Sequence, residues 1–144
     1  MKKIGLLIVL FISLVSCSND DNDNKPTEDY LGKWKLTSMN RNKNPAANSI
    51  GVMEWEESYI FSSDGKFTKT RIRDNKTSSV SGTYSVVETL EQTQLKLMYS
   101  TKNDIIGTCT EDLIENLYII YATGKLYSTW AACDGPLLVY DKLK

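Results

Sequence analysis

The sequence predicts an all-β protein built as a single antiparallel up-and-down barrel of about eight strands. Three observations support this fold class. After residue 30, apolar and polar residues alternate with the two-residue period of strands, and turn-forming residues recur at short intervals. No long apolar stripe occurs at the spacing of a helix. Strands joined in sequence order form a meander, and closing that meander removes its unpaired edges.

Several segments have the alternation and composition of strands. In the first, Trp34 and Leu36 fall on one face, and the last follows a turn formed by Asp134, Gly135 and Pro136. Together they span roughly 115 residues, which is sufficient for one small domain with a single core. The expected strands are residues 32–39, 54–61, 66–73, 80–87, 95–99, 105–113, 117–122 and 137–143.

The connections between these segments are rich in Asn, Asp, Ser and Gly. The strongest turn signal is the Asp64-Gly65 pair, because glycine supplies the positive φ that hairpin turns need. Gly82 is suited to a bend or a bulge within a strand. Turns or loops are expected at residues 40–51, which include Pro45, at 62–65 and at 75–79, and a short edge segment at 127–132.

The hairpin around Gly65 sets a register that brings aromatic and cationic residues to one face. If Gly65 occupies the left-handed bulge position of a three-residue loop, Phe61 pairs with Phe67, and the pairing continues outward from there. This face is the more apolar and should point inward. Aromatics with fixed cations, partly neutralised by a glutamate, suit a small anionic ligand with an apolar body. The candidate cavity residues are Trp55, Glu57, Tyr59, Phe61, Phe67, Lys69, Arg71 and Arg73.

Two alternatives to this cavity stay open. A register slip of one residue would turn the whole row to the other face of the sheet. The long cationic side chains could also extend from the barrel mouth into water.

The C-terminal third of the chain is rich in aromatic residues. An exposed aromatic platform can stack on sugar rings, whereas buried aromatics would form barrel wall and core. The sequence leaves both readings open. These residues are Tyr118, Tyr121, Tyr127, Trp130 and Tyr140.

Catalytic and metal-binding signatures are missing from the sequence. The chain contains no histidine, the commonest general base and metal ligand. Glu54, Glu56 and Glu57 lie close together as glycosidase carboxylates would, but no second carboxylate cluster accompanies them, which favours a solvated strand edge. The sequence has no nucleophile elbow, P-loop or zinc spacing. We therefore expect no enzyme activity, no cofactor and no metal.

The first residues have the order of a secretory signal. Two lysines precede an apolar run at residues 4–15, and the small residue Ser16 stands before Cys17. The run is too short to span a bilayer, which takes about 20 apolar residues. The segment ending in Cys17 resembles a bacterial lipobox, which implies removal of residues 1–16 and acylation of the cysteine. The alternative is an ordinary signal peptide in which this cysteine is incidental.

Residues 17–30 form an acidic stretch that offers no aliphatic side chain to bury. Such a segment cannot offset its ordering entropy, so we expect a flexible tether. Ser18 stands where an aspartate would be the retention signal for the inner membrane, which favours the outer membrane. The acidic residues also resemble a surface-export signal; the alternative is a spacer without a sorting role. The expected location is the outer membrane, with a lipid anchor at Cys17 and the domain at the cell surface.

The net charge limits the kinds of partner that we expect, and the cysteine content predicts a covalent bond. The formal net charge of the chain is −1, without the basic excess that nucleic acid binding needs. Once Cys17 is acylated, Cys109 and Cys133 remain in an oxidising compartment, which predicts a disulfide. The alternative is two buried free thiols.

Residues 31–144 resemble the lipocalin-like lipoproteins of Gram-negative bacteria. The likeness rests on the order GKWKL, FSSDGKF, SGTY, LKL and CDGPLLVY behind the lipobox. In lipocalins, the tryptophan of the G-x-W opening, here Trp34, plugs the closed end of the barrel. An arginine often stacks on that tryptophan, whereas the final strand here offers only Lys142 and Lys144, and an ammonium cannot stack as a guanidinium does.

This resemblance implies a non-catalytic lipoprotein whose barrel holds a small apolar or amphipathic ligand at the cell envelope. The second hypothesis is an accessory subunit whose barrel is filled with side chains and whose outer face docks on an outer-membrane protein. The interior discriminates between them. A cavity of about 300 Å³ or more favours a ligand, whereas a packed interior with an exposed apolar patch favours docking.

Overall fold

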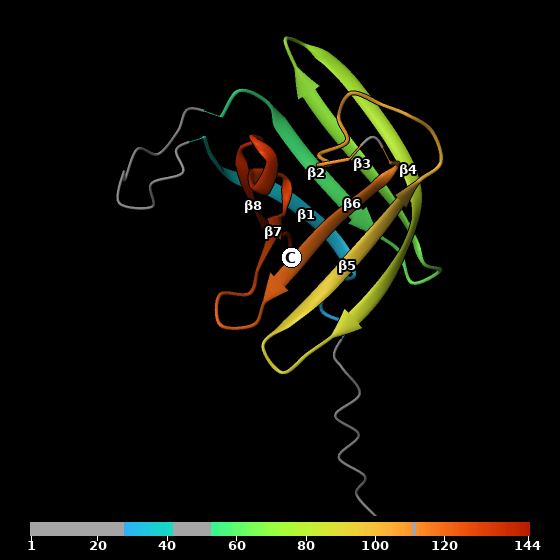
Figure 1. Ribbon diagram of the computed structural model, residues 1–144, viewed down its shortest axis with the longest axis vertical. Coiled ribbons are helices and arrows are strands. Elements are labelled where there is room, and N and C mark those ends of the chain that lie inside the picture. The colour runs from blue at the N-terminus through green and yellow to red at the C-terminus, as the bar shows by residue number, and fades with distance from the viewer. Residues whose placement is uncertain (1–27, 42–52, 111) are drawn as a thin grey trace, which may run out of the picture.

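The computed structural model describes residues 28–41, 53–110 and 112–144. The strands form a closed antiparallel barrel in which each pairs with its neighbours in sequence and the last pairs with the first (Figure 1). The prediction of an all-β up-and-down barrel is therefore confirmed. The strands are β1 (Gly32–Asn40), β2 (Glu56–Phe61), β3 (Lys66–Arg73), β4 (Lys76–Glu88), β5 (Gln92–Tyr99), β6 (Ile114–Ile120), β7 (Lys125–Ser128) and β8 (Leu137–Lys142), with a 3-10 turn, η1 (Trp130–Cys133), before β8.

Some sequence-based expectations lie outside the described residues. These are the signal peptide at residues 1–16, the acylated Cys17, most of the tether and most of the loop at residues 40–51.

The β2–β3 hairpin has the predicted register. Phe61 is opposite Phe67, Tyr59 opposite Lys69 and Glu57 opposite Arg71. Gly65 adopts a φ of 77°, the left-handed conformation expected of a bulge glycine. The alternative of a one-residue slip is therefore excluded, and the odd-numbered residues at 57–61 and at 67–71 face the interior.

The expected turn at residues 75–79 is wrong beyond its first position. Asp74 and Asn75, with φ of 51° and 61°, form a two-residue turn by themselves. Asp and Asn tolerate this left-handed conformation better than most residues do. Lys76 already pairs with Arg73, so β4 begins there and extends the hairpin.

Gly82 does not form a bulge, because it pairs in regular register with Phe67 on one side and Tyr99 on the other. Glycine is required at this position because neighbouring atoms approach its backbone too closely for a Cβ. A Cβ at this position would lie 2.0 Å from the carbonyl oxygen of Met98 and 2.9 Å from the Phe67 ring. The register shift in the wall lies elsewhere, between Leu36 and Ser38 of β1.

The described residues of the expected strand at 105–113 are not in a strand. Residues 105–110 have no regular structure, and the disulfide of Cys109 ties them to η1. The eighth strand of the barrel wall is instead β7, which pairs with β6 and β8. The expected edge segment at residues 127–132 is therefore also wrong: its first two residues end β7, and the remainder leads into and forms part of η1.

The barrel has two different ends. The start of β1 lies at the same end as the β2–β3, β4–β5 and β6–β7 turns, while η1 and residues 100–113 lie at the opposite end (Figure 1). We call the first the tether end and the second the η1 end. Trp34 is buried near the tether end, and its indole N–H donates to the carbonyl of Tyr30 at 2.9 Å. Lys142 Nζ lies 6.0 Å from the centre of the Trp34 ring and donates to the carbonyl of Asp29 at 2.6 Å.

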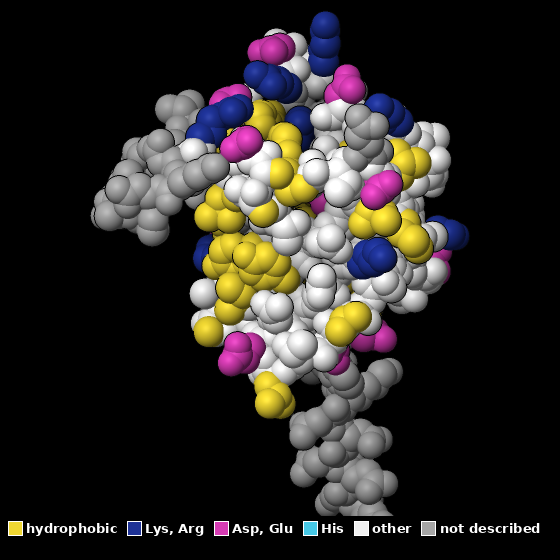
Figure 2. Space-filling model, in the orientation of Figure 1, with side chains coloured by type: hydrophobic (Ala, Val, Ile, Leu, Met, Phe, Trp, Pro, Cys, Tyr) yellow, Lys and Arg dark blue, Asp and Glu magenta, His cyan; other side chains and the backbone are white. Residues whose placement is uncertain are grey.

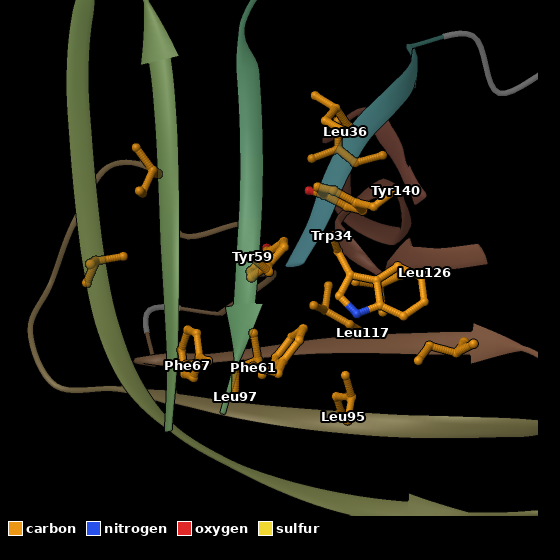
Figure 3. Close-up of a cluster of buried hydrophobic side chains, with 14 of the residues drawn as sticks. Trp34, Leu36, Tyr59, Phe61, Phe67, Leu95, Leu97, Leu117, Leu126 and Tyr140 are labelled. Carbon is orange, nitrogen blue, oxygen red and sulfur yellow. The ribbon is translucent and has the colours of Figure 1, made fainter. Parts of the chain in front are cut away.

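The core is built from side chains of strands around the whole circumference of the barrel. Figure 3 shows Trp34 and Leu36 from β1 pointing inward with Tyr59 and Phe61 from β2. Aromatic rings contact one another along β2, where Tyr59 and Phe61 stack at 5.8 Å between ring centres, and between strands, where Tyr59 lies 5.1 Å from Tyr140. The fully buried apolar side chains include Trp34, Tyr59, Phe61, Phe67, Leu95, Leu97, Leu117, Leu126, Leu138 and Tyr140.

Candidate functional site: a charged cluster inside the barrel

The predicted cavity residues divide into buried and exposed groups. Trp55, Tyr59, Phe61 and Phe67 belong to the buried core. Three charged residues are buried beside these aromatics, namely Glu57, Lys69 and Arg71. Arg73 does not line the interior, because 53% of its side chain is exposed and it lies 3.5 Å from Glu54 at the barrel surface. The alternative that the cationic side chains extend into water is therefore correct for Arg73 and wrong for Lys69 and Arg71.

Lys69 lies in the middle of the barrel with no exposed side-chain surface. Its ammonium donates to both carboxylate oxygens of Glu115, at 3.1 and 3.2 Å, and lies 3.3 Å from an oxygen of Glu57. The ammonium also lies 5.0 Å from the centre of the Tyr59 ring. All three ammonium protons thus have an anionic or aromatic partner close by.

Arg71 lies nearer the η1 end of the barrel. Its Nε donates to Glu57, and a terminal nitrogen donates to the carbonyl of Ile105 at 3.3 Å. The guanidinium carbon lies 4.3 Å from the centre of the Trp55 ring and 6.0 Å from that of Trp130. The guanidinium is therefore held between two indoles as well as by a carboxylate.

Three tyrosines complete the cluster. The Tyr140 hydroxyl donates to Glu57 at 2.7 Å, the Tyr59 hydroxyl donates to Glu115 at 3.0 Å, and the Tyr99 hydroxyl also donates to Glu115.

Burial raises the pKa of each of these tyrosines well above its ordinary value. The nearby carboxylates add to this effect, first Glu115 for Tyr59 and Tyr99 and first Glu57 for Tyr140. Because each phenol stays protonated, it remains a donor to its carboxylate.

The cluster is neutral as a whole. Two cations, Lys69 and Arg71, face two carboxylates, Glu57 and Glu115. Buried charges are tolerated where they are paired and where their remaining hydrogen-bonding positions also have partners. Here the tyrosine hydroxyls are those partners for the two carboxylates. The cations are therefore already neutralised by the chain itself.

Glu115 is the member of this cluster that the sequence reasoning missed. It shares strand parity with the buried Leu117 and Ile119, which is the signal that could have placed it inside. The expected strands ended at residue 113 and began again at residue 117, so this glutamate fell in the connection between them.

A buried polar atom beside the cluster lacks a hydrogen-bond partner within the part of the chain that the structure describes. This atom is the indole nitrogen of Trp55, whose N–H makes no hydrogen bond there. Buried polar groups nearly always have a hydrogen-bond partner. The unpaired N–H of Trp55 beside Arg71 is therefore an exception that draws attention to this position at the η1 end.

Cys109 and Cys133 form the predicted disulfide, with their Cα atoms 5.4 Å apart. The alternative of free thiols is excluded. The bond joins the irregular segment before β6 to η1, so it holds two parts of the η1 end together.

Two hollows lie on the outer face of the wall. One, of about 220 Å³, lies over β1–β3 and is lined by residues that include Lys35, Ser58 and Thr70. The other, of about 430 Å³, lies over β5 and β6 beneath the disulfide-bonded segment. Within the described ranges, no group of three or more Asp, Glu, Cys or His residues is placed to hold a metal ion. No helix in that part of the chain is long and apolar enough to cross a membrane.

Comparison of the chain with protein-family models, curated proteins and solved structures finds no match. The fold itself defines the class: an eight-stranded closed up-and-down barrel, which fits a lipocalin-like fold. Fold alone does not determine function, so the function of this barrel is inferred from its sites.

Proposed function

We propose that this chain is an envelope lipoprotein, anchored in the outer membrane through acylated Cys17, whose filled barrel is a rigid accessory scaffold. One observation carries the scaffold part of the proposal: Lys69, Arg71, Glu57 and Glu115 neutralise one another in the middle of the barrel. An anionic ligand in that position would have to displace a carboxylate that already has several donors. The barrel is therefore better suited to displaying its outer surface than to enclosing a fatty acid.

The anchoring part rests on the sequence and on the position of β1. The lipobox-like segment ends at Cys17, only a short stretch before the first described residue, Glu28. Two or three acyl chains, each contributing about 0.8 kcal/mol per buried methylene, bind a membrane stably, whereas one chain does not. Because β1 starts at the tether end, this end would face the membrane and the η1 end would face away from it.

The anchor is tested by Cys17→Ser. We expect this variant to leave the membrane fraction, because no acyl chain can be attached. The matched control is Cys109→Ser combined with Cys133→Ser, which removes the other cysteines and should stay with the membrane. Unchanged membrane association of Cys17→Ser would contradict the lipoprotein assignment. Protease treatment of whole cells, with a periplasmic protein as control, tests exposure at the surface.

A second candidate function is the binding of a small amphipathic anion at the η1 end. The specific observation that favours it is the unpartnered indole N–H of Trp55 beside Arg71. Arg71 has terminal guanidinium protons beyond those used by Glu57 and Ile105. A carboxylate at the edge of the barrel could accept from these two groups while its apolar part contacts Trp130.

This candidate is tested by titrating fatty and aromatic acids into the wild type and into Arg71→Ala. A charge-assisted hydrogen bond contributes about 1.5–3 kcal/mol, so the loss of affinity should be roughly ten- to a hundredfold. Arg73→Ala is the matched control, because that arginine also lies over Trp55 but is exposed. Circular dichroism must show that the variants are folded. If no acid binds, or if Arg71→Ala binds equally well, the second candidate is eliminated.

A further inference from the structure

The larger outer hollow is polar and is bounded by well-defined elements. It has a volume of about 430 Å³, within the usual range for small-molecule sites. Its floor is the outer face of β5 and β6, and one wall is the segment held by the Cys109–Cys133 disulfide. The lining residues that the argument uses are Gln94, Lys96, Thr108, Asp112, Asn116 and Thr129.

The floor of this hollow carries polar side chains without protein partners. Lys96 is opposite Asn116 across the β5–β6 ladder, and Gln94 lies two residues before Lys96 on the same outward face. Among the described residues, the side chains of these three make no hydrogen bond or ion pair. Two amides and an ammonium thus offer several donors and two carbonyl acceptors to a molecule seated there.

A pair of stacked tyrosines borders the same floor. Tyr118 is opposite Gln94 and lies two residues beyond Asn116, so its side chain leaves the wall on the same face. Its ring stacks on that of Tyr127, with centres 5.6 Å apart and planes 13° apart. Figure 2 shows hydrophobic side chains gathered where Figure 1 places the lower part of β7, beside a polar area over β5 and β6 that carries few charged side chains.

We propose that this face binds a neutral saccharide. Amide groups exchange hydrogen bonds with hydroxyls in either direction, and the apolar C–H face of a sugar ring packs against an aromatic ring. The described charged residues that line the hollow are Lys96, Asp112 and Glu115, and Glu115 is already paired with Lys69 inside the barrel. Lys96 and Asp112 are of opposite sign, which favours a ligand without net charge. The disulfide holds the wall of the hollow in place, so little ordering is needed on binding. The hollow meets the charged cluster only at Glu115, and the side chains that would contact the saccharide lie on the outer face of the wall. Binding here does not depend on acylation of Cys17.

The test titrates a panel of neutral mono-, di- and oligosaccharides into the mature protein and follows binding by NMR chemical shifts and by calorimetry. Loss of the tyrosine ring in Tyr118→Ala should weaken binding about tenfold. Loss of the amide in Asn116→Ala should weaken it roughly three- to tenfold. The matched control is Tyr121→Ala, which removes an exposed tyrosine at the tether end and should bind normally.

Two results would overturn the proposal. The first is that no saccharide of the panel binds to the folded wild type at millimolar concentration. The second is that a saccharide binds but Tyr118→Ala and Asn116→Ala bind it as the wild type does, which would place the site elsewhere. Chemical-shift changes confined to β5–β7, residues 107–110 and Asp112, and lost in Tyr118→Ala, are the expected result.

Discussion

Lys69 is the residue on which the interior depends most. Its ammonium is fully buried and contacts both carboxylates of the cluster. A buried charge that loses its partner costs far more than an exposed one, because neither water nor another charge compensates for it. Substitutions at this position should therefore affect stability strongly.

We expect Lys69→Met to lower the free energy of unfolding by about 3–5 kcal/mol, because two carboxylates would share the single positive charge of Arg71. Denaturant unfolding followed by circular dichroism measures this change. Combining Lys69→Met with Glu115→Gln restores neutrality, so the double variant should regain part of the loss. A single variant as stable as the wild type would show that the cluster does not stabilise the barrel.

The buried tyrosines predict a loss of stability at high pH. The folded-state pKa of Tyr59, Tyr99 and Tyr140 is raised, whereas an unfolded tyrosine ionises at about pH 10. The folded state then binds more protons than the unfolded state, so stability is full below pH 10 and decreases above it. Each tyrosine contributes a slope of up to about 1.4 kcal/mol per pH unit.

Phenolate absorbance during an alkaline titration tests this linkage. The three buried tyrosines should ionise only together with loss of the near-ultraviolet circular dichroism. Ionisation of every tyrosine in a folded protein would contradict the assignment of these phenols as buried donors.

The sequence predicted the residue pairs of the β2–β3 hairpin because a turn glycine and a two-residue period determine them. It did not predict that Glu115, distant in the chain, would neutralise Lys69. Pairing between side chains on distant strands depends on barrel closure and stagger, which local patterns do not contain.

At the scale of elements, strands with clear alternation were predicted and irregular segments were not. Residues 105–113 contain enough apolar residues for a strand, but the disulfide at Cys109 and the close approach of Gly107 to Glu115 and Trp130 keep them across the barrel end. The short strand β7 has few residues to show alternation. Contacts with distant parts of the chain therefore determine the conformation of both segments.

Removal of the disulfide tests how much this arrangement stabilises the fold. The cysteines are 24 residues apart, so Cys109→Ala with Cys133→Ala should lower the free energy of unfolding by roughly 3 kcal/mol in the chain-entropy model. Denaturant unfolding of the oxidised wild type, the reduced wild type and the variant measures it. Equal midpoints for all three proteins would mean that the bond does not constrain the unfolded chain.

At the scale of the whole molecule, the barrel combines a neutral, hydrogen-bonded interior with a polar outer hollow beside stacked tyrosines. Barrel closure follows from the number of strands and their sequential connections, so the sequence was sufficient to predict it. Whether the interior was a container or a filled core depended on residues brought together only by closure.

The most direct test of a filled barrel is native mass spectrometry of the mature protein purified from its own host. We expect the mass of the acylated chain without a small molecule bound inside, and the same result for Arg71→Ala. An amphipathic ligand that stays bound to the wild type and is lost in Arg71→Ala, with both proteins folded, would contradict the filled barrel and establish a container.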